Sequence, residues 1–121
     1  MADKELLEMA AKAAGIVVNA NRQAERDSLN LKCQVGLWTD TSTNWNPLTN
    51  DGDALRLLAV LPSLWGLSLK FGTPSIKMSV AWGTGRGIEA VEFAGEGVDR
   101  ATAIRRAIVR AAAEIGKGLP K

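Results

Sequence analysis

The segment DRATAIRRAIVRAAAEIG, residues 99–116, carries the clearest secondary-structure pattern in the chain. Its apolar residues recur at the i, i+3, i+4, i+7 spacing that aligns them along one side of a helix. They are Ala101, Ile104, Ile108, Ala111 and Ile115. Asp99 is a good N-cap residue, and Gly116 is the residue at which we expect the helix to end. The segment therefore predicts an amphipathic helix as the last element of the fold.

The residues before this helix alternate between apolar and polar types in two clear runs, 63–71 and 76–82, and in a weaker one, 88–93. This alternation predicts half-buried strands. The expected buried residues are Trp65, Leu67, Leu69, Phe71, Ile76, Met78, Val80 and Trp82. The linking segments GTPS (72–75) and GTGRG (83–87) are short and rich in turn residues, so we expect antiparallel neighbours joined by hairpin turns.

The residues on the opposite side of these strands are small or polar. They are Ser68, Lys70, Lys77, Ser79 and Ala81. A fully covered sheet face would carry more apolar residues, so this pattern predicts a face that is solvated or thinly covered.

Two further helices and one further strand are expected in the first half of the chain. Residues 3–15 form an amphipathic pattern, and residues 51–61 are apolar almost all round. Residues 31–38 alternate as a strand, whereas the polar stretch 19–30 shows no periodicity and is expected to be a mobile loop. The order αβαβββα predicts a single α+β domain, residues 1–121, with about four antiparallel strands and three helices.

The segment WNPLTNDGDALRLL, residues 45–58, combines an aromatic residue, a proline and a cluster of small polar residues. Asn50 and Asp53 stand at the spacing of an N-cap residue and the third residue of the following helix. The alternative is a metal site made by Asn50, Asp51 and Asp53. Neither the position of the glycine nor the residues that follow fit a calcium-binding loop. We therefore favour helix capping.

The residue types in the chain make an enzyme the less favoured class. Histidine is absent, which removes the commonest general base and the commonest zinc ligand. The single cysteine, Cys33, lies in an alternating apolar run, where a buried inert thiol is favoured over a reactive one. GTGRG lacks the lysine–serine pair and the following helix of a phosphate-binding loop. The remaining enzymatic hypothesis is a histidine-free hydrolase that uses Asp51 and Asp53; we expect no catalytic residue, metal or cofactor.

The overall composition is that of a folded soluble protein, with 46% hydrophobic and 23% charged residues. The net charge is +2 and the pI is near 8.9, short of the pI above about 9 that is typical of a nucleic-acid-binding domain. No segment approaches the ~18 consecutive apolar residues of a membrane span, and the first residues are acidic where a signal peptide is basic. We expect a cytoplasmic protein without membrane association.

The polar side of the predicted C-terminal helix carries Arg106, Arg110 and Lys117 within an arc of roughly 40°. Three aligned cations can follow a phosphate backbone. A second basic surface on the open sheet face would consist of Lys32, Lys70, Lys77 and Arg86. The same pattern is typical of the solvated side of a surface helix, which we favour. Nucleic-acid binding through Arg106, Arg110 and Lys117 is therefore the alternative function.

Three segments resemble a family of small uncharacterised phage and prophage proteins, which includes NinX-like proteins. WNPLTNDGDALRLL is similar to the family motif W-N-P-L-x-D-D-G-D-A-L-R-L, with Asn50 in place of an acidic residue. Residues 99–117 resemble the family's C-terminal helix, and residues 1–16 resemble its N-termini. The resemblance implies an α-β-α sandwich and a phage-encoded accessory protein in the cytoplasm of a bacterial host. It brings no established activity and no catalytic residues.

The expected function is therefore non-enzymatic binding of a host or phage macromolecule, with a protein as the favoured partner. Trp45, Leu48 and Arg56, beside the apolar helix 51–61, form one candidate partner surface, and a homodimer would use the same surface. The competing interpretation is that Trp45 and Leu48 pack over the start of that helix as a plug. The other tryptophans, at positions 38, 65 and 82, are likewise interpreted as core residues rather than as an aromatic binding platform.

Overall fold

The computed structural model describes residues 3–29, 36–39, 44–61, 64–71, 75–82, 86–93 and 99–118. These residues form four helices and two small antiparallel sheets, which confirms the α+β class. The helices are α1 (Asp3–Ala14), α2 (Ala20–Leu29), α3 (Asp51–Val60) and α4 (Arg100–Lys117). The strands are β1 (Leu37–Trp38), β2 (Asn44–Trp45), β3 (Leu64–Phe71), β4 (Ser75–Trp82) and β5 (Arg86–Phe93).

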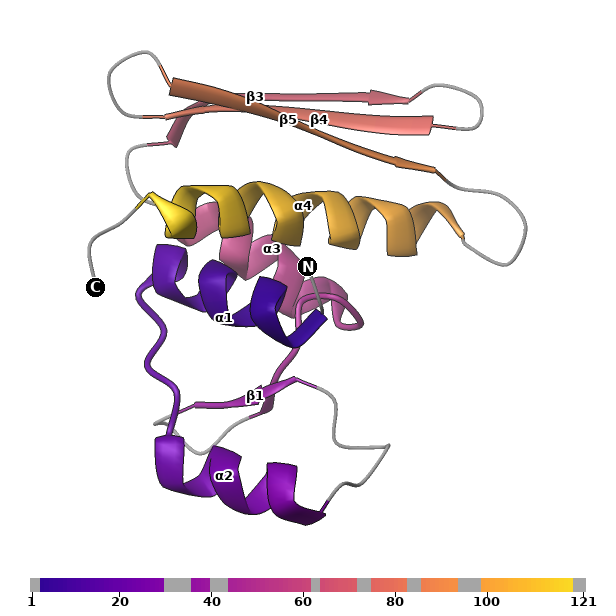
Figure 1. Ribbon diagram of the computed structural model, residues 1–121. Coiled ribbons are helices and arrows are strands. Elements are labelled where there is room, and N and C mark those ends of the chain that lie inside the picture. The colour runs from indigo at the N-terminus through magenta and orange to yellow at the C-terminus, as the bar shows by residue number, and fades with distance from the viewer. Residues whose placement is uncertain are drawn as a thin grey trace.

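Helix α4 is the central layer of the molecule (Figure 1). The sheet β3–β4–β5 lies on one side of it, and α1 and α3 lie on the other. Of the predicted apolar stripe, Ala101 is exposed and Ile104 is half-buried, but because two layers cover α4, its buried residues include several outside that stripe. The buried residues are Ala103, Ala107, Ile108, Val109, Ala111, Ala112, Ala113, Ile115 and Gly116. Most of them are small, which lets the flanking elements approach the helix axis closely.

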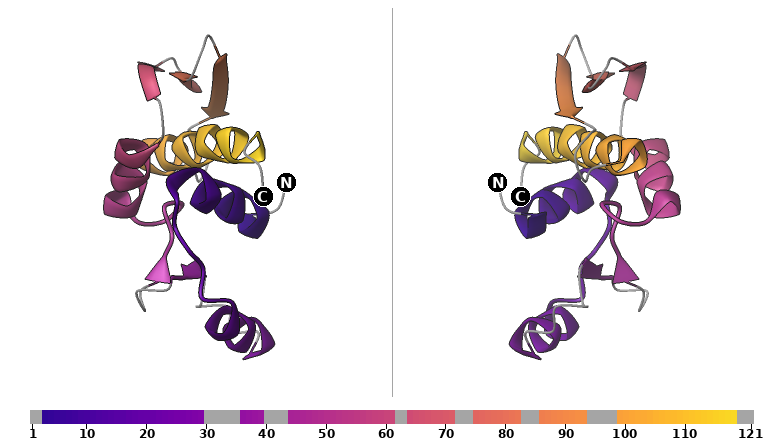
Figure 2. Two further views of the ribbon diagram at one scale, coloured as in Figure 1. Left: turned by 90° about the vertical axis from the view of Figure 1, so that its left-hand side faces the viewer. Right: turned by 90° about the vertical axis from the view of Figure 1, so that its right-hand side faces the viewer.

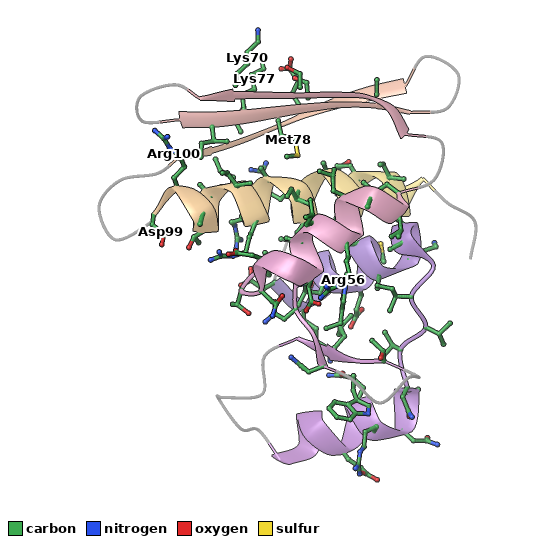
Figure 3. The ribbon with its side chains drawn as sticks, turned by 180° about the vertical axis from the view of Figure 1, so that it is seen from behind. Arg56, Lys70, Lys77, Met78, Asp99 and Arg100 are labelled. Atoms are coloured by element: carbon green, nitrogen blue, oxygen red, sulfur yellow. The ribbon has the colours of Figure 1, made fainter. Side chains whose placement is uncertain are left out.

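This layer order differs from the α-β-α sandwich that the resemblance implies. In the described part of the chain, helices cover the face of the β3–β4–β5 sheet that is directed towards α4, and none lies on its outer face (Figures 1 and 2). The outer face is polar: Ser68 and Lys70 are exposed, and Lys70 and Lys77 point away from α4 (Figure 3). Such a face gains little from a covering helix, and it agrees with the predicted solvated face.

The inner face of this sheet packs on α4 through strands β4 and β5. Ile76 and Met78 are buried as predicted, and Met78 points towards α4 (Figure 3). In the antiparallel register Phe71 pairs with Ile76 and Leu69 pairs with Met78. Several predictions fall on side chains or segments outside the described structure. These are Trp65, Leu67, Leu69, Phe71, Val80, Trp82, Arg86, the run 31–35 with Lys32 and Cys33, and the turn residues 72–74 and 83–85.

The region between α1 and α3 differs from the prediction in two ways. Residues 20–29 form helix α2 rather than a mobile loop. The part of the predicted strand 31–38 that the structure describes as a strand, Leu37–Trp38, pairs with β2 in a sheet of its own. The element order is therefore ααββαβββα. Helix α2 has a mostly polar sequence, so no apolar periodicity marks it. Hydrogen bonds at its start define it instead: the Asn19 side chain accepts from the Arg22 N–H at 3.0 Å.

The ends of α1 and α4 show two different uses of glycine. Gly15 has a positive φ of 73°. The Ile16 N–H bonds the Ala11 carbonyl at 2.9 Å and the Gly15 N–H bonds the Lys12 carbonyl at 3.3 Å, which is the Schellman arrangement of a helix end. Gly116, in contrast, does not end α4 as predicted. The helix continues to Lys117, and Gly116 lies inside it at the point where the Met9 backbone of α1 leaves no room for a Cβ atom.

The N-cap residue of α4, Asp99, makes the free energy of unfolding depend on pH in the acidic range. The Asp99 carboxyl has a pKa below its ordinary value of 3.8, mainly because the Thr102 side chain hydrogen-bonds to it; the Thr102 N–H and the Arg105 charge act in the same direction. Since the folded pKa is the lower one, the charged cap stabilises the fold above about pH 4, and this contribution is lost as the pH falls through the folded pKa.

Asp99→Asn keeps a capping oxygen but removes the titrating group. Between about pH 7 and about pH 2.5, the wild type is expected to lose more of its free energy of unfolding than the variant does. Urea denaturation across this range measures both profiles. Parallel profiles would show that the Asp99 charge does not contribute.

Candidate functional site

The segment that leads into α3 is a rigid joint organised by Asn46. The buried Asn46 side chain accepts a hydrogen bond from the Leu48 N–H at 3.1 Å, and the Asn46 backbone N–H donates to the Asp53 carboxylate at 3.0 Å. Its backbone carbonyl accepts from the Asn50 N–H at 2.9 Å. The Asn50 side chain in turn caps α3 by accepting from the Asp53 N–H at 2.9 Å. The capping interpretation of Asn50 and Asp53 is therefore confirmed.

Arg105 fastens α4 to this joint. Its Nε donates to the Leu48 carbonyl at 2.9 Å, and its two terminal nitrogens donate to the Asp51 carboxylate at 2.6 Å and to the Thr102 hydroxyl at 3.0 Å. The side chain is only 16% exposed. Each guanidinium nitrogen thus has a partner within the chain, so Arg105 positions α3 against α4 and is not available to bind an anion.

Above this contact, α3 and α4 enclose the α3–α4 groove, an open depression of about 340 Å³. Its lining residues are Asp51, Ala54, Leu55, Ala101, Ile104, Arg105 and Ile108. All are apolar except the paired Arg105 and Asp51. Leu55 forms part of one wall and is 67% exposed. The groove is thus suited to receive apolar side chains, and the carboxylate in its lining is held by an arginine.

The predicted partner surface of Trp45, Leu48 and Arg56 is wrong in two of its three residues. Trp45 and Leu48 are buried and belong to the main hydrophobic core. They therefore act as the plug at the start of α3. Arg56 is exposed (Figure 3) and forms an ion pair with Asp53 at 2.9 Å. The large apolar residues of this helix that are exposed are instead Leu55 and Val60.

The basic residues of α4 are partly neutralised by carboxylates from other elements. Arg106 lies 3.1 Å from the Asp3 carboxylate in α1 and 3.8 Å from Glu92 in β5. Arg110 lies 2.7 Å from Glu92 and also donates to the Val91 carbonyl at 2.9 Å. These two arginines therefore join three elements of the fold, which reduces the charge they can offer to a phosphate backbone.

Two further cations of the proposed basic surfaces, Lys117 and Lys77, are also paired, whereas Lys70 is exposed. Lys117 pairs with Glu114 at 2.8 Å, so Glu114 is not the partner of Arg110 that its helical spacing suggests. On the outer sheet face, Lys77 pairs with Glu89 at 3.0 Å. The second basic surface is therefore partly neutralised as well.

The acidic residues near α3 have structural partners. Asp51 pairs with Arg105 and Asp53 accepts from Asn46 and Arg56. In the described part of the chain, no group of three or more His, Cys, Asp or Glu residues is placed to hold a metal ion. No helix among the described residues is long and apolar enough to cross a membrane.

No family model, curated protein or solved structure matches the chain. The described fold itself defines the class: a small α+β protein in which a helix lies between a three-stranded sheet and two further helices. Its candidate site is the α3–α4 groove. Sequence reasoning missed the groove because Ala101 and Ile104 lie about 50 residues from Leu55 in the chain. The available signal was the apolar character of residues 51–61 on almost all sides.

Proposed function

We propose that this protein is a non-enzymatic, phage- or prophage-encoded accessory protein that acts by binding a host or phage protein. The phage origin rests on the resemblance of residues 45–58 and 99–117 to phage proteins. The binding function rests on one observation, which is that Leu55 is 67% exposed beside an apolar groove. An exposed leucine that borders an apolar depression marks an interaction surface better than a scattered apolar residue does.

The shape and lining of the groove favour an amphipathic helix of the partner protein as the bound element. Two helices form its walls, and Leu55, Ile104 and Ile108 supply apolar surface for residues at i, i+3 and i+4 of a third helix. Asp51 and Arg56 are exposed charges of opposite sign on the α3 side, and they suit the polar flanks of such a helix.

Nucleic-acid binding through Arg106, Arg110 and Lys117 is the alternative. Its support is that each of these side chains is about two-fifths exposed, at 39%, 43% and 43%. Against it stand the carboxylate partners of all three, since a phosphate would have to displace Asp3, Glu92 or Glu114 from them. Protein binding is therefore the favoured function.

Leu55→Asp should reduce partner recovery at least tenfold, the equivalent of about 1.4 kcal/mol in affinity, because it places a charge in the groove. Tagged protein is used to capture partners from host lysate with and without nuclease at two salt concentrations. Val60→Asp is the matched control, since Val60 is 53% exposed on the same helix but does not line the groove. Both variants should fold, because neither residue is buried.

Two results would contradict the proposal. The first is equal recovery by Leu55→Asp and by the control. The second is recovery that disappears with nuclease or at the higher salt concentration, and with Arg106→Ala and Arg110→Ala, which would establish the nucleic-acid alternative because phosphate contacts weaken steeply with salt.

A further inference from the structure

Strand β3 forms one border of the sheet β3–β4–β5. It pairs with β4 on one side, and no described strand pairs with its other side. Helix α4 packs against β4 and β5, and Figure 2 shows β3 and β5 at opposite borders of the sheet. The backbone groups along the outer side of β3 are thus placed to pair with another strand.

The opposite border of the sheet is obstructed. The Arg110 guanidinium reaches from α4 and donates to the carbonyl of Val91 in β5 at 2.9 Å. Glu92 holds the same guanidinium at 2.7 Å. A strand that added to β5 would compete with this arginine, so the two borders are not equivalent.

Strand β3 carries few of the features that keep edge strands from pairing. Lys70 is its only charged residue, and it contains no proline. A register shift between Leu64 and Gly66 affects only its first residues, and regular pairing with β4 runs from Gly66 to Phe71. The regular part is long enough to form a ladder with a further strand.

We propose that two copies of this chain pair through β3, antiparallel about a two-fold axis, to form a continuous six-stranded sheet. A second copy is the occupant that the asymmetry favours, because one open border among the described strands of each chain gives a closed pair rather than a fibre. An axis centred on Ser68 places Lys70 opposite Gly66 of the second copy. No like charges then face each other directly across the new ladder.

Sedimentation equilibrium at increasing protein concentration is expected to show a monomer–dimer equilibrium. Ser68→Lys brings two lysines together at the axis and is expected to weaken dimerisation at least tenfold, because like charges directly opposite each other are unfavourable. Ser79→Lys is the matched control, since Ser79 is the register partner of Ser68 on the central strand β4. It makes the same chemical change one strand away from the interface and should leave dimerisation unchanged.

Hydrogen exchange of the wild type supplies a readout that needs no variant. Amides of β3 should exchange more slowly at high than at low protein concentration, whereas those of β5 should not change. A chain that stays monomeric would overturn the proposal. So would a dimer in which the β3 amides exchange at the same rate at all protein concentrations and Ser68→Lys leaves dimerisation unchanged. Leu55→Asp should leave this dimer intact, so the two surfaces are tested separately.

Discussion

Gly116→Ala is expected to lower the free energy of unfolding by about 2 kcal/mol. A Cβ atom at this position would overlap the backbone carbonyl of Met9 in α1, because α1 and α4 approach each other closely there. Overpacking against backbone costs about 3 kcal/mol, the upper part of its usual range. Alanine gains up to about 1 kcal/mol over glycine inside a helix, so the steric term decides the sign.

Urea denaturation of the wild type and the variant measures this loss. Gly118→Ala is the control, because Gly118 is an exposed C-cap residue with an ordinary φ of −82°. Its change in the free energy of unfolding should stay within about 0.5 kcal/mol. A Gly116→Ala variant as stable as the wild type would show that α1 and α4 can separate without cost.

Arg105→Met should destabilise the protein by about 2 kcal/mol. Methionine keeps an apolar stem but leaves the carbonyl of the buried Leu48 without its donor, and an unsatisfied buried acceptor costs about 1–3 kcal/mol. The lost pair with Asp51 adds little, because Asp51 is 80% exposed.

Arg106→Met tests whether this effect is specific to Arg105. Arg106 is the next residue of α4, and its side chain is 39% exposed with surface carboxylates as partners. Its replacement should cost less than about 1 kcal/mol. Thermal and urea denaturation of both variants give the comparison, and equal losses would refute the role assigned to Arg105 as the fastener between α4 and the joint before α3.

The elements that could be predicted from the sequence are those with a long or well-capped pattern. Helix α4, the three strands β3 to β5 and their antiparallel order follow from periodicity and short connections. The cap at Asn50 follows from residue spacing. Helix α2 could not be predicted from periodicity, because its contacts are polar: the Gln23 side chain accepts from the Trp38 N–H at 2.8 Å.

The layer order and the candidate site depend on contacts between distant segments. The helical spacing places Arg106 and Arg110 on one side of α4, but Asp3 and Glu92 come from elements elsewhere in the chain. Likewise, the apolar pattern around Leu55 predicts a helix that is buried on most sides or covered by a partner. It does not indicate that Ile104 of α4 supplies the opposite wall. Local patterns describe each helix, whereas the groove exists only between them.

The close contact between α1 and α4 has a consequence for the order in which the chain can fold. Translation delivers α1 first and α4 more than 80 residues later, yet the buried side of α1 packs mainly on α4. Leu6, Leu7 and Ala10 are buried in the folded protein, but the helix that covers this side of α1 is absent until α4 has left the ribosome. Closing so long a loop has an entropic cost and slows folding. The core of this protein therefore assembles only after α4 has been synthesised, when this helix arrives between two layers that precede it in the chain.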